Sequence, residues 1–170
     1  MKSRFEAVIE LLNTTPTHRI AGGAEKTFFQ ELQAAGGTEL TDILTELATE
    51  QRGVVGTKAL YALLAFDYDH GSEILETNLT HYDNGVMWGA CHVLASHGSE
   101  RSVTHVINVL MNEPDASVRH VAAYALGCLG SKKAIPALRH AIRHDQGTDW
   151  EGHPVAEMAE DALRHLEKQA

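Results

Sequence analysis

Apolar residues recur along the chain with the spacing of an amphipathic helix, and this pattern occurs in four copies. The copies begin at Val55, Val86, Val118 and Val155, so successive copies start 31, 32 and 37 residues apart. In each copy, apolar residues also stand four, seven and eight positions after the first. This spacing places them on one face of a helix that packs against a core.

A second helix is predicted before each copy. Residues 134–142 and residues 102–110 carry apolar side chains at matching positions, again 32 residues apart. Pro136 falls in the first turn of the later segment, where its missing N–H group costs no helical hydrogen bond. Earlier in the chain, the first helices of the other two pairs are predicted from their apolar residues. These are Ile74 and Leu79 in one pair, and Leu40, Ile43, Leu44 and Leu47 in the other.

Polar residues and glycines mark the turns between these helices. Asp83 and Asp115 each stand three residues before the first valine of a copy, where a side-chain oxygen can cap the start of a helix. Gly98 and Gly130 follow the apolar runs and are predicted to end the helices, as C-terminal glycines commonly do. The pattern therefore predicts a series of helical hairpins.

The same pattern divides the chain into a repeat array and a preceding segment. Residues 38–170 are predicted to form about four helical hairpins. Residues 1–37 lack the repeat signature and are predicted to form capping helices over residues 3–12 and 25–33. We therefore predict an all-α fold, an α-α superhelix in which stacked hairpins share a continuous core.

One segment resembles a known repeat family. Residues 115–130, followed by residues 134–138, are similar to the short HEAT-like repeat named after the phycobilin lyases. The likeness continues over residues 83–112 and 153–166. The resemblance implies a HEAT-like solenoid. It implies no single function, because such repeats occur in lyases, scaffolds, adaptors and enzymes alike.

The chain is acidic, which narrows the classes of partner. It has 23 Asp and Glu against 14 Lys and Arg, and a formal net charge of -9. Nucleic acid and anionic membrane surfaces would be repelled on average, so we predict neither as a partner.

The longest apolar stretch, residues 54–66, is too short to span a bilayer, and no signal-peptide pattern opens the sequence. We expect a cytoplasmic protein whose Cys91 and Cys128 are reduced thiols.

A row of exposed aromatic and imidazole side chains is predicted on the second helices of the repeats. The third, seventh and eleventh positions of each copy lie four residues apart and face away from the core. Aromatic residues anchor many protein interfaces, so we predict a partner-binding surface there. Its predicted residues are Trp88, His92, His120, Tyr124, Tyr61 and Asp161. A plainer interpretation also fits, in which Trp88 packs over a neighbouring helix and Tyr124 merely covers a groove.

The chain has eleven histidines, but none belongs to a ligand set of recognised spacing. His140 and His144 stand four residues apart, and His153 lies among carboxylates in the long loop that follows. No Cys-x-x-Cys or His-Glu-x-x-His occurs. A di-iron deoxyhypusine hydroxylase built from similar repeats uses His-Glu pairs, whereas here Val121 follows His120. We predict no metal and no cofactor, and keep His140, His144 and His153 as the candidate ligands.

A binding role fits these observations best. We predict a protein-binding adaptor, scaffold or inhibitor that makes and breaks no covalent bonds. The alternative is a bilin lyase-like subunit, which would hold a tetrapyrrole against Trp88, Tyr124 and Asp161. A metal-dependent enzyme is the third interpretation.

Overall fold

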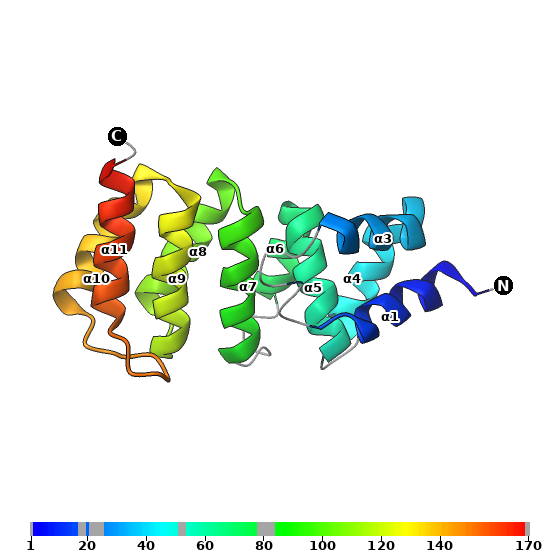
Figure 1. The fold of residues 1–170 in the computed structure, drawn as a ribbon, viewed down its shortest axis with the longest axis horizontal. Coiled ribbons are helices and arrows are strands. Elements are labelled where there is room, and N and C mark those ends of the chain that lie inside the picture. Colours follow the sequence, from blue (N-terminus) through cyan, green and yellow to red (C-terminus); the bar gives the residue numbers. More distant parts are fainter. Residues whose placement is uncertain (1, 17–19, 21–25, 51–53, 78–83, 169–170) are drawn as a thin grey trace. The chain divides into compact units, whose positions relative to one another are not determined.

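The computed structural model describes residues 2–16, 20, 26–50, 54–77 and 84–168, which are mostly helical (Figure 1). The all-α prediction is confirmed, because no strand occurs in those ranges beyond one isolated bridge between Thr148 and Pro154. The chain divides into two compact units, residues 1–82 and residues 83–170. The predicted boundary between capping helices and array, at residue 37, stays a prediction.

The first unit contains the segments predicted as capping helices and the segments predicted as the first repeats. Helix α4 packs against α5, α5 packs against α6, and α1 packs against both α3 and α5. Its core is aliphatic, with Leu12, Leu44 and Leu60 fully buried. The elements are α1 (Arg4–Thr14), α3 (Lys26–Gly36), η1 (Gly37–Glu39), α4 (Leu40–Glu50), α5 (Val54–Phe66) and α6 (Tyr68–Thr77).

A buried lysine fastens the end of α1 to α5. The Nζ atom of Lys58 donates hydrogen bonds to the carbonyl oxygen of Leu12, at 2.7 Å, and to that of Thr15, at 2.5 Å. The Leu12 carbonyl lies in the last turn of α1 and the Thr15 carbonyl at its C-cap, where no further helical turn supplies donors. Burial lowers the pKa of Lys58. Lys58 is therefore a structural group, unavailable to an outside ligand.

The second unit has two layers of helices (Figure 1). Helix α9 packs between α7 and α11 in one layer, while α8 and α10 pack behind it in the other. The connections are short except for the loop from residue 145 to residue 154. The elements are α7 (Asn84–His97), α8 (Glu100–Asn112), α9 (Ala116–Leu129), η3 (Lys132–Ala134), α10 (Ile135–His144) and α11 (Val155–Lys168).

The predicted turn residues of α9 occupy their predicted positions. The Oδ1 atom of Asp115 accepts hydrogen bonds from the N–H groups of Ser117, at 2.8 Å, and Val118, at 3.2 Å. Gly130 ends the helix with a φ of 73°, a conformation that favours glycine. The predicted cap Asp83 lies outside the described residues, as does Leu79.

Small residues let helices α9 and α11 pack closely against each other. Gly127 of α9 faces α11, and a Cβ atom added there would come within 3.1 Å of Ala162. Leu126, beside it in the sequence, is fully buried in the core of the second unit. The repeated alanines in the pattern therefore allow helices α9 and α11 to approach each other, which fixes the side chains that they present to solvent.

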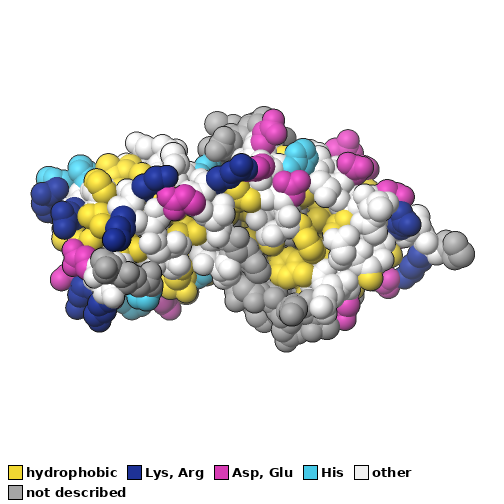
Figure 2. Space-filling view, turned by 90° about the horizontal axis from the view of Figure 1, so that it is seen from above, with side chains coloured by type: hydrophobic (Ala, Val, Ile, Leu, Met, Phe, Trp, Pro, Cys, Tyr) yellow, Lys and Arg dark blue, Asp and Glu magenta, His cyan; other side chains and the backbone are white. Residues whose placement is uncertain are grey.

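Charged side chains of both signs lie on the face shown in Figure 2. Lysines and arginines are most numerous toward the left of this view, whereas aspartates and glutamates are most numerous toward its middle and right.

Candidate functional site

Three of the predicted surface residues form a cluster of rings on α7 and α9. The ring centroids of Trp88 and His92 lie 4.1 Å apart, with an angle of 58° between the rings. The centroid of His92 lies 5.7 Å from that of Tyr124 on the adjacent helix. Trp88 and His92 are one helical turn apart, and α9 packs directly against α7, so the three rings share one face. We call Trp88, His92 and Tyr124 the ring cluster.

The outer members of the ring cluster are open to solvent. Trp88 is 37% exposed and Tyr124 is 43% exposed, whereas His92 between them is half-buried. Burial lowers the pKa of His92 below its ordinary value, so the imidazole is neutral at neutral pH. The cluster therefore offers two large aromatic surfaces and one uncharged polar ring.

The two cysteines have different surroundings. Burial, together with the charge of Glu113, raises the pKa of the Cys91 thiol to about 12, which suits an inert core residue. Cys128 is exposed at the edge of the ring cluster. Its side-chain hydrogen bond with Tyr124 raises the pKa of that phenol.

His120, also predicted for the surface, lies beside the long loop rather than in the ring cluster. Its Nδ1 atom is 3.8 Å from the Oδ2 atom of Asp149, and its ring centroid is 6.2 Å from that of His153. The His120 side chain is only 16% exposed. Burial lowers the pKa of His120 by more than the charge of Asp149 raises it. The predicted row is thus two groups, the ring cluster and His120 with the loop.

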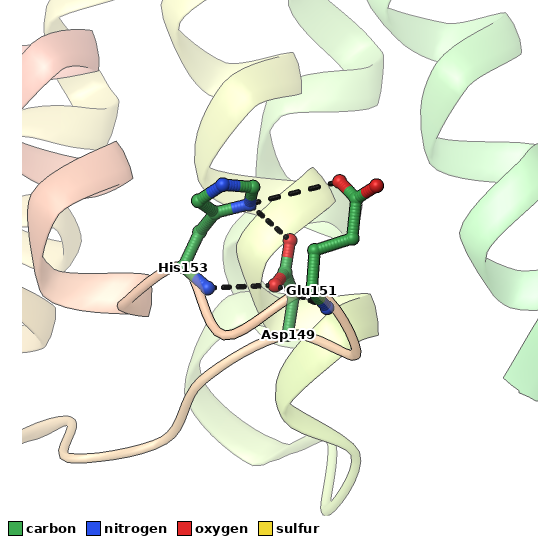
Figure 3. Close-up of side chains that lie close together, drawn as sticks. All are labelled: Asp149, Glu151 and His153. Atoms are coloured by element: carbon green, nitrogen blue, oxygen red, sulfur yellow. Dashed lines mark hydrogen bonds and ion pairs between the residues drawn. The ribbon is translucent and has the colours of Figure 1, made fainter.

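Hydrogen bonds to one carboxylate give the loop its shape (Figure 3). The Oδ1 atom of Asp149 accepts from the N–H groups of Glu151, at 2.9 Å, and His153, at 2.8 Å. Its Oδ2 atom lies 3.2 Å from Nδ1 of His153. Burial acts to raise the pKa of Asp149, but the hydrogen bonds from His153 and Glu151 outweigh it and lower the pKa. Gly152, with a φ of 91°, completes the turn.

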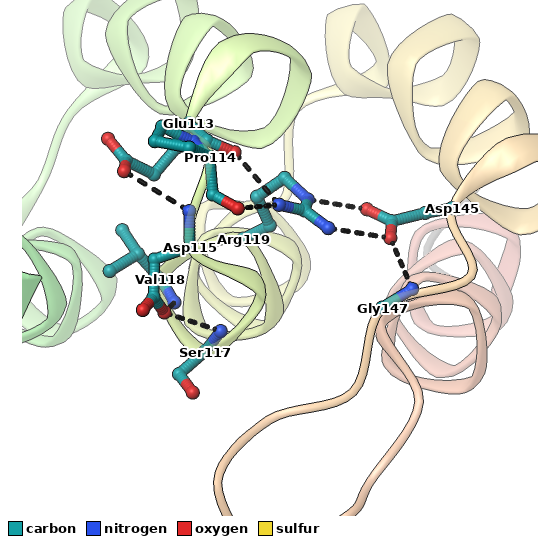
Figure 4. A network of polar contacts seen from close by, with 8 residues as sticks. All are labelled: Glu113, Pro114, Asp115, Ser117, Val118, Arg119, Asp145 and Gly147. Carbon is teal, nitrogen blue, oxygen red and sulfur yellow. Dashed lines mark hydrogen bonds and ion pairs between the residues drawn. The ribbon is translucent and has the colours of Figure 1, made fainter.

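An arginine on α9 holds the beginning of the loop (Figure 4). Arg119 donates from Nε to Oδ2 of Asp145, at 2.7 Å, and from Nη2 to Oδ1, at 2.9 Å. Its Nη1 atom donates to the carbonyl oxygens of Glu113, at 2.9 Å, and Pro114, at 2.7 Å. Asp145 in turn accepts from the N–H of Gly147 at 2.9 Å. The guanidinium therefore joins two connections and has a structural role.

Trp150 is a surface residue that the repeat pattern did not reveal. Trp150 is 74% exposed, and its backbone N–H donates to the hydroxyl of Ser117 at 3.1 Å. The pattern concerned helices only, whereas Trp150 stands in a polar, glycine-containing loop. A single large aromatic residue in such a loop is the signal that could have identified it.

Tyr61 is not a surface residue, so that prediction was wrong. Its side chain is only 2% exposed. Helix α5 is apolar on nearly every side, with Leu60, Leu63 and Leu64 also fully buried, and so has no solvent-facing row at that position. Asp161 is exposed on α11, where it pairs with Arg164. Its part in binding stays a prediction.

The candidate metal ligands fall into two places. The rings of His140 and His144 lie 4.6 Å apart on α10, beside a hollow of about 290 Å³ that Arg119 also lines. His153 instead belongs to a group with Asp149 and Glu151, whose ligand atoms lie within 4.8 Å of one another. Among the residues that the structure describes, these three side chains are close enough to one another to hold a metal ion together.

One segment of the chain matches a known family of repeats. Residues 72–152 match the family of HEAT repeats, which supports the predicted HEAT-like repeat fold. Curated proteins and solved structures gave no match. None of the described helices combines the length and apolar character needed to cross a membrane. HEAT repeats generally serve as scaffolds for protein interactions, whereas the resemblance to the phycobilin lyase type stays a prediction.

Proposed function

We propose that this chain, whose residues 72–152 carry HEAT repeats, binds another protein through the ring cluster on α7 and α9. The observation that carries the proposal is the contact of Trp88 with His92 and of His92 with Tyr124, on a face where both aromatic side chains are open to solvent. Trp and Tyr are the residue types that most often dominate binding energy at protein interfaces.

The ring cluster suits burial against a partner for two physical reasons. Its helices are held by a core that includes Leu94 and Leu126, so the rings are presented on rigid elements and little order has to be gained on binding. His92 is neutral at neutral pH because burial lowers its pKa. Removing a neutral imidazole from water costs much less free energy than removing a charged one.

The acidic balance of the chain favours a basic partner. The formal net charge is -9, and exposed Glu157 and Asp161 lie on α11, the helix that packs against α9. Complementary charge around an aromatic centre speeds association and selects among partners. The proposed partner is therefore a protein with an apolar pocket and a basic rim, and the chain acts as an adaptor, scaffold or inhibitor.

The test begins with native mass spectrometry of the protein gently purified from its host. A bound protein would identify the partner, whereas a bound tetrapyrrole would favour the lyase-like alternative. The dissociation constant is then measured for Trp88→Ala and for Trp88→Ala with Tyr124→Ala. We expect the double variant to bind about 100-fold more weakly, which corresponds to roughly 3 kcal/mol.

Trp150→Ala is the matched control, because Trp150 is the other exposed tryptophan and lies outside the ring cluster. It should leave the dissociation constant within about twofold of the wild-type value. Circular dichroism should show the same helical content for all variants. An unchanged affinity in the double variant would show that the partner binds elsewhere.

A further inference from the structure

We propose that His120, Asp149, Glu151 and His153 form a binding site for a divalent transition-metal ion, with zinc the ion that the donor atoms suit best. The four side chains come from two separate elements. His120 belongs to α9, and the other three belong to the loop before α11. Figure 3 shows the three loop residues Asp149, Glu151 and His153. They offer two imidazole nitrogens and two carboxylate oxygens. This site is independent of the ring cluster and of the proposed partner.

The spacing of the donor atoms is the first argument. Oδ2 of Asp149 lies 3.2 Å from Nδ1 of His153 and 3.8 Å from Nδ1 of His120. Nδ1 of His153 lies 3.7 Å from Oε2 of Glu151. A tetrahedral zinc ion with bonds of about 2.0–2.2 Å keeps its ligand atoms about 3.3–3.6 Å apart. Asp149, Glu151 and His153 therefore need to shift only slightly to enclose an ion, because their ligand atoms all lie within 4.8 Å of one another. His120, which approaches the Asp149 carboxylate, has to move closer to complete the shell.

The orientation of Asp149 is the second argument. Its Oδ1 atom is occupied by the N–H groups of Glu151 and His153, so the carboxylate is held in one position. Its Oδ2 atom then points toward both imidazoles, and the side chain is only 8% exposed. The central ligand is therefore already in place, and its conformational freedom has been removed by folding of the loop.

The mixture of donors is the third argument, and it sets the class of ion. Two carboxylates alone would be ordinary on the surface of an acidic protein. Here His120 and His153 face the same carboxylate oxygen from different elements. Imidazole nitrogen is a ligand for zinc and its neighbours in the transition series, whereas calcium and magnesium take oxygen. Two carboxylates also balance the charge of a divalent ion.

The experiment uses the full chain, stripped of metal by a chelator and titrated with zinc chloride in a calorimeter. We expect one saturable equivalent of zinc. Glu151→Gln and His153→Asn should each weaken binding by about tenfold or more. Both side chains are more than half exposed, so the variants are expected to fold. His140→Ala with His144→Ala is the control, since it removes two other exposed imidazoles and should leave the affinity unchanged.

Cobalt supplies a second readout that a purely structural role would not change. Tetrahedral Co²⁺ bound by nitrogen and oxygen gives strong visible absorption, which should appear with the wild-type protein and weaken in Glu151→Gln. Three results would overturn the proposal. They are the absence of saturable zinc binding, equal binding by Glu151→Gln and wild type, and loss of binding in the His140 and His144 control.

Discussion

Arg119 on α9 binds both carboxylate oxygens of Asp145 at the end of α10, through two of its nitrogen atoms. The same guanidinium donates to two carbonyl oxygens in the connection between α8 and α9. One side chain therefore ties together two inter-helix connections. This arrangement holds the loop that carries Asp149 against α9, the helix that carries His120.

Removing this arginine should destabilise the second unit. Arg119→Met leaves the Asp145 carboxylate without its cation and two carbonyl oxygens without a donor, while keeping most of the side-chain volume. We expect the free energy of unfolding to fall by about 3 kcal/mol, as when one partner of a largely buried pair is removed. Urea denaturation followed by circular dichroism measures the change.

Arg139→Met is the matched control for that prediction. Arg139 also pairs with a carboxylate, Glu167, but both side chains are more than half exposed and lie 3.5 Å apart. Exposed ion pairs contribute little to the stability of the fold. The free energy of unfolding of Arg139→Met should therefore differ from the wild-type value by less than about 1 kcal/mol. Equal losses in the two variants would contradict a special role for Arg119.

Acid should weaken the wild-type protein through Asp145. The paired hydrogen bonds from Arg119 are the largest effect on this carboxyl and hold its pKa below the ordinary value of 3.8. The stabilisation is therefore fully present above about pH 4 and is lost as the pH falls through the folded-state pKa. Urea denaturation across this acidic range should show a smaller loss of stability in Arg119→Met than in wild type.

The helices could be predicted from the sequence because their apolar spacing is local. Asp115 and Gly130 cap α9 as predicted, since capping depends on neighbours within a few residues. Tyr61 was misplaced because the rule for exposed positions assumes that a helix has one solvent-facing side, and α5 has almost none. That rule describes an isolated helix, whereas burial depends on everything packed around it.

The association of His120 with Asp149 and His153 depends on contacts that no periodicity reveals. The loop from residue 145 to residue 154 has no repeating pattern, and its position is set by Arg119 and by the hydrogen bond from Trp150 to Ser117. These partners are 26 and 33 residues apart. The sequence indicated which residues lie in the loop, but it gave no means of placing the loop against α9.

The burial of Leu126 tests the predicted assignment of core and surface positions along α9. Its side chain is fully buried, so Leu126→Ala should lower the free energy of unfolding by about 2–5 kcal/mol, through lost burial and the cavity left behind. Met111→Ala is the control, because Met111 is 40% exposed and should cost far less. Urea denaturation compares the two. A free energy of unfolding unchanged in Leu126→Ala would contradict the assigned register.

The pKa of His92 tests the packing of the ring cluster. Because burial lowers this pKa below 6.5, the unfolded chain binds more protons than the folded protein just below that pH. The contribution of His92 to stability is therefore complete above pH 6.5 and is lost as the pH falls toward the folded-state pKa.

NMR titration of the His92 ring should give a pKa below 6.5 in the wild type. Trp88→Ala uncovers the imidazole and should move its pKa back toward 6.5, whereas Trp150→Ala should leave it unchanged. A wild-type value at or above 6.5 would mean that Trp88 and Tyr124 do not enclose His92 in solution.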